Sequence, residues 1–300
     1  MQDKITQILQ DIKLGNFQAI ARAITMVENM LDGSEVLLQH LSAQKDTKVV
    51  GITGPPGAGK STLVNALLHY WMQQNKRIAV IAVDPSSPFN LGALLGDRIR
   101  MSEFYNHPNV YIRSLASRGA LGGLHHQIYE VTDILKHANF DYILVETVGV
   151  GQSEIDIAGM ADCTVVTLVP EAGDEIQTLK SGIMEIADVF VVNKADRPLA
   201  ESLINSLKAM LHDFSTHQIE VIKTIASQME GIENLSLAID AILKKTDIHK
   251  ERKLALTLEK CWRIIQHNKM KLIIRTEIEA KLANELLKDD FNLYKFCAQF

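Results

Sequence analysis

The sequence of 300 residues lacks any apolar run approaching the roughly 20 residues that a bilayer-spanning helix needs. Its longest strand-like run, Ile78–Val83, is about a third of that length. The N-terminus lacks the apolar stretch of a signal peptide, and its acidic residues do not fit a transit peptide. We therefore expect a cytoplasmic protein without membrane association.

The chain also lacks an excess of basic residues, since 31 Lys and Arg face 36 Asp and Glu, for a net charge of −5. This balance argues against nucleic-acid binding through a broad basic face. The three cysteines, Cys163, Cys261 and Cys297, form no CxxC pair and have no metal-ligand spacing. Their odd number argues against a disulfide framework, so we expect a reducing compartment.

Short apolar runs are present throughout the middle of the chain, from Lys48 to about Lys245, and they alternate with helical patterns. The runs occupy residues 49–53, 78–83, 109–112, 142–145, 163–169, 189–192 and 219–222. Continuous apolar strands are typical of sheets that are buried on both faces, and alternation with helices indicates parallel strands. The sequence therefore predicts an α/β fold, a mainly parallel sheet flanked by helices.

Helical spacing of apolar residues marks both ends of the chain, where no strand-like run occurs. We therefore predict an N-terminal helical segment over 1–45, a central nucleotide-binding domain over 46–245 and a C-terminal helical arm over 246–300.

A phosphate-binding loop is indicated directly after the first apolar run. The residues expected to surround the phosphates are Gly54, Pro55, Pro56, Gly57, Ala58, Gly59, Lys60, Ser61 and Thr62. They fit the pattern G-x-x-x-x-G-K-[ST] in the required strand–loop–helix context. Glycines allow backbone N–H groups to turn toward an anion, and the following helix adds the positive end of its dipole. We expect Lys60 to reach the β- and γ-phosphates and the Ser61 hydroxyl to bind Mg²⁺.

The base that the site reads is indicated by Asn193, Lys194 and Asp196, which follow the run 189–192 as N-K-A-D. A carboxylate at Asp196 can accept hydrogen bonds from the ring N–H and the exocyclic amine of guanine, a donor pair that adenine lacks. A further base contact is expected after the last run, at Ile225, Ala226 and Ser227, with the Ala226 N–H as the donor. GTP or GDP with Mg²⁺ is thus the expected ligand.

Acidic residues after other strands supply candidates for the metal site. Glu146 ends the run 142–145 and could hold Mg²⁺, while the N–H of Gly149 could hold the γ-phosphate. Asp84 could be a switch acid near the metal or an ordinary turn residue. Asp97 could likewise be a switch acid or an ordinary surface acid. Lys180 could be a solvated helix lysine or a mobile switch residue, and spacing does not decide between them.

A water-positioning residue is not evident, because Val150 stands where Ras-like proteins have glutamine. Slow intrinsic hydrolysis is therefore expected, with Lys60, Glu146 and Asp97 as the catalytic candidates.

Several segments together resemble one family. They are GITGPPGAGKSTLVNAL, VDPSSPFNLGALLGDRIRM, SRGALGGL, VETVGVGQSEIDIAGMAD, PEAGDEIQTLKSGIMEIAD and VVNKAD. They resemble the MeaB/ArgK group of P-loop GTPases, to which the methylmalonic aciduria type A protein belongs. The similarity runs from about Gly15 to about Ile242.

The resemblance implies a GTPase metallochaperone that gates cofactor loading of an adenosylcobalamin-dependent acyl-CoA mutase of the methylmalonyl-CoA mutase type, and protects it. It also implies that Asp84, Asp97 and Glu146 are switch carboxylates around the metal. Lys180 would then belong to an additional switch that responds to the mutase. Relatives dimerise through C-terminal helices, so the arm is expected to make a homodimer, although it could instead pack on the chain's own helices.

Two other functions share a phosphate loop of this kind. A P-loop kinase acting on a small molecule or a transport protein would need an acceptor pocket and a base near the γ-phosphate, and no motif marks either. A nickel-insertion GTPase would need a histidine-rich tract or a Cys/His pair, and the sequence has neither. N-K-A-D favours a GTP-driven switch over the kinase.

Overall fold

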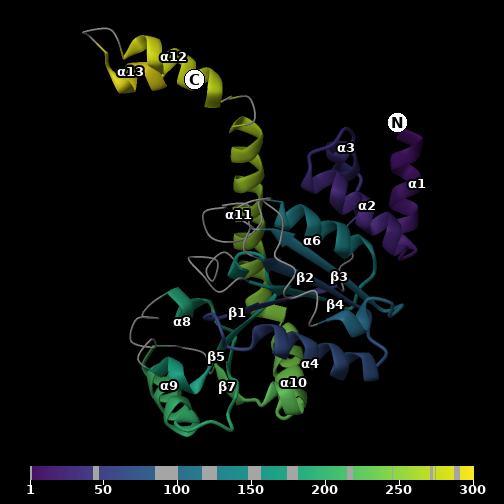
Figure 1. Cartoon of the computed structure of the whole chain (residues 1–300), viewed down its shortest axis with the longest axis vertical. Helices are drawn as coiled ribbons and strands as arrows, with labels where there is room; N and C mark the ends of the chain where they lie inside the picture. The colour runs from purple at the N-terminus through teal and green to yellow at the C-terminus, as the bar shows by residue number, and fades with distance from the viewer. Residues whose placement is uncertain are drawn as a thin grey trace. The chain divides into compact units, whose positions relative to one another are not determined.

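The apolar runs of the sequence are the strands of one sheet (Figure 1). The structure is a computed structural model that describes residues 2–42, 47–84, 101–116, 127–147, 157–173, 182–214, 219–244, 246–270, 273, 275–286 and 291–300. The strands are β1 (Lys48–Thr53), β2 (Ile78–Asp84), β3 (Val110–Ala116), β4 (Tyr142–Glu146), β5 (Cys163–Leu168), β6 (Val189–Val192) and β7 (Glu220–Lys223). Their order is β3-β2-β4-β1-β5-β6-β7, and every neighbouring pair is parallel. The predicted parallel α/β sheet is confirmed.

Helices connect the strands and extend the chain at both ends. The α-helices are α1 (Gln2–Lys13), α2 (Phe17–Glu28), α3 (Ser34–Gln39), α4 (Lys60–Gln73), α6 (Ile128–His137), α8 (Gly182–Ile186), α9 (Ala200–Phe214), α10 (Ile232–Leu243), α11 (Thr246–Met270), α12 (Arg275–Glu285) and α13 (Leu293–Cys297). Short 3₁₀ turns are η1 (Ser102–Phe104), η2 (Pro170–Gly173) and η4 (Ala226–Gln228). The predicted helical extensions at the two ends are therefore present.

The sheet separates two hydrophobic layers, because successive residues of a strand point to opposite faces. Val49 of β1 packs in the layer that contains α1, α2, α3 and α6, whereas its neighbour Val50 packs in the layer that contains α4 and α10. Phe190 of β6 belongs to a further cluster with α9. Burial on both faces explains why the inner strands β4, β5 and β6 read as apolar runs.

The N-terminal helices are fastened to the sheet layer by Arg77, which precedes β2. Its guanidinium donates hydrogen bonds to the carbonyls of Gly15 (2.8 Å) and Ala138 (3.1 Å). The same group lies 5.5 Å from the ring centre of Phe17 and 4.8 Å from that of Phe140. Burial lowers the pKa of the Arg77 guanidinium from its ordinary value. One side chain thus joins the turn between α1 and α2 to the segment after α6.

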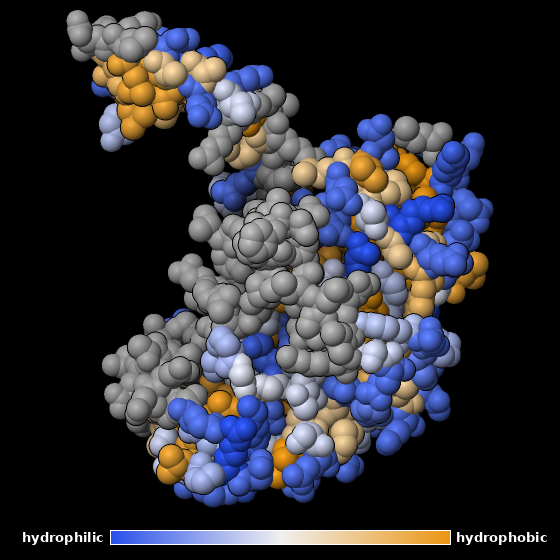
Figure 2. All heavy atoms as spheres, viewed as in Figure 1, coloured by the Kyte–Doolittle hydropathy of each residue, from blue (hydrophilic) through white to orange (hydrophobic). Residues whose placement is uncertain are grey.

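The chain divides into two compact units, Met1–His249 and Lys250–Phe300. The first contains the sheet, the N-terminal helices and α10. In the second, the Phe296 ring centre lies 6.3 Å from that of Phe291 and 5.4 Å from that of Phe300. Figure 2 shows hydrophobic side chains gathered over α12 and α13 within this unit. None of the described helices is both long and apolar enough to cross a membrane.

Candidate nucleotide-binding site

The predicted site residues follow the carboxyl ends of strands in the middle and on one side of the sheet. The phosphate loop follows β1, Glu146 ends β4, Asn193 follows β6, and the residues Thr224–Ser227 follow β7. Because all these strands are parallel, their carboxyl ends meet at one edge of the sheet. We call Thr224–Ser227 the base loop.

The backbone of the phosphate loop binds the side chain of Lys60. Lys60, the first residue of α4, is only 6 % exposed. Its ammonium donates to the carbonyls of Gly54 (2.9 Å) and Pro55 (3.1 Å). These carbonyls hold a positive charge inside the loop at the start of a helix, where an anion is favoured by free N–H groups and by the helix dipole.

Gly59 shows why this loop needs glycine. Its φ is +84°, and a Cβ built there would lie 2.5 Å from Nδ2 of Asn193. The loop backbone therefore comes close to the segment after β6, and a side chain at this position would push the two apart.

A buried oxygen pair joins α4 to β4. The Ser61 hydroxyl donates to Oε1 of Glu146 at 2.7 Å, and both residues are buried. The hydroxyl of Thr147, the residue after Glu146, shares a hydrogen bond of 2.9 Å with that of Thr53 at the end of β1. Hydroxyl and carboxylate oxygens are the donors that Mg²⁺ prefers, so Ser61 and Glu146 fit that ion chemically.

Asn193 connects the phosphate loop to the base loop. Its Nδ2 donates to the Ala58 carbonyl at 3.0 Å. Its Oδ1 accepts from the Thr224 hydroxyl and from the Ala226 N–H, each at 3.1 Å. The side chain is 2 % exposed. One amide therefore fixes three segments that are far apart in the sequence.

Lys194 makes a second connection to the phosphate loop. Its φ is +54°, and its ammonium donates to the Gly57 carbonyl at 2.7 Å. Asp196 lies exposed two residues later. The next residue, Arg197, forms an ion pair with Glu171, and that hydrogen bond lowers the pKa of the Glu171 carboxyl. The segment after β6 thus contacts both the phosphate loop and η2.

The base loop places its predicted residues in different environments. Ala226 is buried, Ile225 is half-buried and Ser227 is exposed. The Ala226 N–H, the expected base donor, is engaged by Asn193, so contact with a base requires that bond to be shared or exchanged. On the phosphate side, Thr62 lies exposed on α4.

Three predicted residues, Asp97, Gly149 and Lys180, lie outside the described residues. Asp84 ends β2, two positions beyond Ala82, which pairs with Glu146, and the structure describes its backbone alone. Among the described side chains, no three His, Cys, Asp or Glu residues gather as a metal site.

Sequence reasoning missed the threonines of the site. Thr224 donates to Asn193, and Thr53 shares a hydrogen bond with Thr147, the residue after Glu146. Each ends a strand or directly follows one, and that position is the signal that could have found them. A groove of about 610 Å³ between β7 and α10 contains no residue of the phosphate loop or the base loop.

The chain is similar to known proteins over most of its length. The family model described as methylmalonyl-CoA mutase-associated GTPase MeaB matches residues 20–277. A protein of Pyrococcus horikoshii that is named as a GTPase is 44 % identical over 239 residues, which cover 77 % of this chain and 75 % of the relative. The mitochondrial methylmalonic aciduria type A homolog of mouse is 37 % identical over 243 residues, which cover 74 % of this chain and 59 % of the relative.

A solved structure with the same fold is that of an LAO/AO transport system kinase. It matches with a TM-score of 0.73 at 23 % identity, covering 100 % of this chain and 97 % of the other. At this identity the likeness shows the fold, a parallel sheet of the P-loop NTPase type, and that part of the sequence prediction is confirmed.

Proposed function

The chain belongs to the MeaB family of methylmalonyl-CoA mutase-associated GTPases, and from this membership we propose that it serves an adenosylcobalamin-dependent acyl-CoA mutase. It is a GTPase, as its named relatives and its P-loop fold indicate. In this proposal GTP hydrolysis gates the loading of cobalamin cofactor into the mutase and protects the mutase from inactivation. No small molecule other than GTP is changed chemically.

The phosphates of GTP would lie in the phosphate loop, whose carbonyls bind the Lys60 ammonium. Lys60 would exchange the carbonyls of Gly54 and Pro55 for phosphate oxygens, which carry more negative charge. Ser61 and Glu146 would hold Mg²⁺, and the ion would offset charge that develops on the phosphates.

The base would lie between the segment after β6 and the base loop. Asp196 would accept from the two guanine N–H donors, while the Lys194 stem would cover one face of the ring. Asn193 would act indirectly, because its three hydrogen bonds hold the surrounding segments. Support for this assignment comes from the exposure of Asp196 beside two segments that Asn193 joins.

The nucleotide state would be sensed by residues that the family resemblance supplies. Gly149 would contact the γ-phosphate, and Asp84 and Asp97 would complete the surroundings of Mg²⁺. Loss of the γ-phosphate would release these contacts, as in other GTPase switches. Lys180 would belong to a switch that responds to the mutase, which would accelerate a slow intrinsic reaction.

The second compact unit is proposed to make a homodimer. On α11, Leu254, Leu258, Trp262 and Ile265 are between 53 % and 72 % exposed in one protomer. Their spacing of four, four and three residues puts them on one face of the helix. An exposed apolar stripe of this kind supports pairing with the same stripe of a second copy.

The observation that carries the mutase proposal is the family match over residues 20–277. The test is capture of a purified adenosylcobalamin-dependent methylmalonyl-CoA mutase by the immobilised chain, with GDP or with a non-hydrolysable GTP analogue. We expect retention that differs between the two nucleotides, and faster phosphate release from GTP when the mutase is added. Equal absence of capture in both states would contradict the mutase role. Transfer of labelled γ-phosphate to a small molecule or a transport protein would instead indicate the kinase function.

A further inference from the structure

Two neighbouring helices each begin at a different half of the proposed nucleotide site. Helix α4 begins at Lys60 of the phosphate loop, and α10 begins shortly after the base loop. They pack in the same hydrophobic layer on one face of the sheet. The positions of these two helices therefore bear on the spacing between the phosphate half and the base half of the site.

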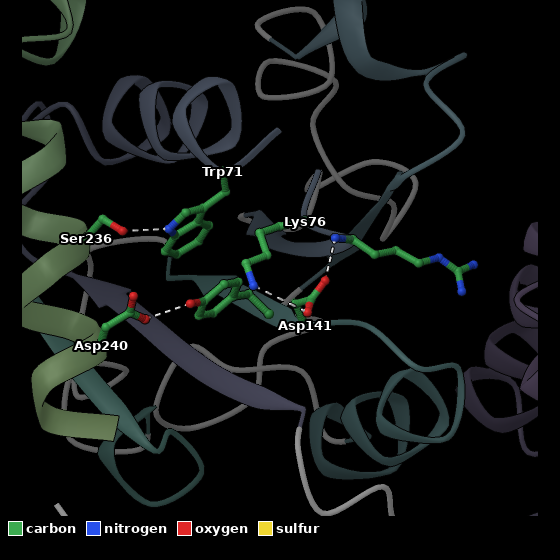
Figure 3. A network of polar contacts seen from close by, with 7 residues as sticks. Trp71, Lys76, Asp141, Ser236 and Asp240 are labelled. Carbon is green, nitrogen blue, oxygen red and sulfur yellow. Dashed lines mark hydrogen bonds and ion pairs between the residues drawn. The ribbon is translucent and has the colours of Figure 1, made fainter. Parts of the chain in front are cut away.

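A buried hydrogen bond joins the two helices directly. Nε1–H of Trp71, in the last turn of α4, donates to the Ser236 hydroxyl of α10 at 2.8 Å (Figure 3). Trp71 is fully buried and Ser236 is 3 % exposed. Because both residues are buried, loss of the acceptor would leave the indole N–H without its partner inside the protein.

A second bond holds α10 one turn further along. Tyr142, the first residue of β4, donates its hydroxyl proton to Oδ1 of Asp240 at 2.6 Å. Its ring stacks on the Trp71 indole, with ring centres 4.1 Å apart and planes 6° from parallel. Burial, followed by the Asp240 bond, raises the pKa of Tyr142, so the hydroxyl keeps its proton and stays a donor. Ser236 and Asp240, four residues apart, lie on the same face of α10.

Helix α4 and strand β4 are in contact at both edges of the sheet. At the nucleotide edge, α4 and β4 are joined by Ser61 and Glu146. At the far edge, the same two elements are joined by the stack of Trp71 on Tyr142. Through its two bonds, α10 attaches to both elements at that far edge.

We propose that Ser236 and Asp240 are positioning residues for GTP binding, because they fix α10 and so hold the base loop at a set distance from the phosphate loop. The inference rests on the proposed nucleotide site. Two binding half-sites held at the spacing of one ligand bind that ligand more tightly than half-sites free to shift. A weaker hold on α10 should therefore reduce the affinity for a whole nucleotide more than the affinity for either end alone.

The test uses the full chain with Ser236→Ala and, separately, Tyr142→Phe, which keeps the ring stack and removes one bond to α10. Calorimetry measures binding of GDP and of inorganic diphosphate, each with Mg²⁺. We expect GDP to bind about fivefold or more weakly in each variant, since one of the two hydrogen bonds that hold α10 is lost. Diphosphate affinity should stay within about twofold, because it contacts one half-site. Ser206→Ala, an exposed serine on α9, is the matched control and should change neither affinity.

The outcomes separate this inference from the nucleotide site itself. Equal weakening of GDP and diphosphate would mean general loss of structure and would overturn the positioning role. Unchanged GDP affinity in both variants would overturn it as well. If the unsubstituted chain bound no GDP, the nucleotide site would fail and the inference with it. Thermal unfolding of each variant shows that binding is measured on folded protein.

Discussion

Asn193 occupies a position that other residue types cannot fill. Its amide nitrogen donates to the phosphate loop while its amide oxygen accepts from two groups of the base loop. Aspartate could accept but not donate, and an apolar residue of similar size could do neither. Because the side chain is buried, each group left without a partner costs free energy that water cannot restore.

The first prediction concerns this residue. Asn193→Asp should lower the free energy of unfolding of the nucleotide-free chain by about 1–3 kcal/mol, since the Ala58 carbonyl loses its donor and faces a carboxylate. Urea unfolding measures the change. Asn205→Asp, the same substitution at an exposed position of α9, is the control. Equal stability of the two variants would contradict the connecting role of Asn193.

The second prediction concerns the choice of base at Asp196. Asp196→Asn replaces an acceptor by a group that can also donate, so preference should shift from guanine to xanthine nucleotides. Calorimetry with GDP, XDP and ADP should show at least a tenfold loss for GDP, as expected when polar groups of a binding site lose their match. Equal affinities of the unsubstituted chain for ADP and GDP would show that Asp196 does not read the base.

At the scale of helices and strands, the sequence predicts which elements form but not which elements pack against each other. The edge strand β7 has exposed Glu220 and Lys223. The inner strands β1, β4, β5 and β6 could be predicted because both faces of each are covered, which makes their runs apolar. Their order could not, since parallel strands with helical crossovers leave no local signal of which strand lies beside which. Likewise, Trp71 and Ser236 are 165 residues apart, and neither residue type is unusual in a helix.

The N-terminal helices illustrate the same limit. Helical spacing predicted them, and Ile12, Ile20 and Ile24 are buried as that spacing requires. Leu14 and Leu31 continue the spacing in the sequence, but both follow the last residue of a helix and are exposed. Periodicity cannot show where one helix ends and the next begins, because the boundary depends on caps such as Asn16, whose side chain accepts from two N–H groups at the start of α2.

The third prediction tests how these helices are attached. Arg77→Ala removes two hydrogen bonds to carbonyls and two ring contacts, so the free energy of unfolding should fall by about 2–4 kcal/mol. Hydrogen exchange should quicken most in α1 and α2. Lys76→Ala is the control, because Lys76 makes an exposed pair with Asp141 at 3.9 Å that should contribute less than about 1 kcal/mol. Similar effects of the two substitutions would contradict the attachment.

The fourth prediction concerns the junction of α4 with β4. Glu146→Gln keeps an oxygen that can accept from Ser61 but removes the negative charge that Mg²⁺ needs. GTP turnover should fall at least tenfold, with a smaller change in GDP affinity, and higher Mg²⁺ should restore part of the rate. Glu103→Gln, an exposed acid, serves as the control. A turnover within a factor of two of the unsubstituted chain would show that Glu146 does not support the metal.

At the scale of the whole molecule, the candidate site is assembled from four separate strand ends of one parallel sheet. Motif spacing predicted each piece, because each lies at the end of a strand or directly after one. Spacing could not reveal the bonds of Asn193 to Ala58 and Ala226, which exist only because β1, β6 and β7 lie within the same half of the sheet. None of the predicted site motifs falls in the second unit, Lys250–Phe300. Its exposed apolar residues therefore indicate a different role.

The fifth prediction concerns that role, a homodimer through α11. The full chain should have a mass near twice 33.4 kDa by light scattering at micromolar concentration. Truncation near Lys245 should leave a folded monomer that binds GDP, because the sheet and its motifs end before that point. Point changes test the interface more finely: Leu258→Glu and Trp262→Glu add charge to the apolar stripe and should dissociate the dimer. Lys260→Glu places the same acidic side chain on the opposite face of α11 and should not. A truncated chain that stays dimeric, or a full chain that is monomeric, would rule out this interface.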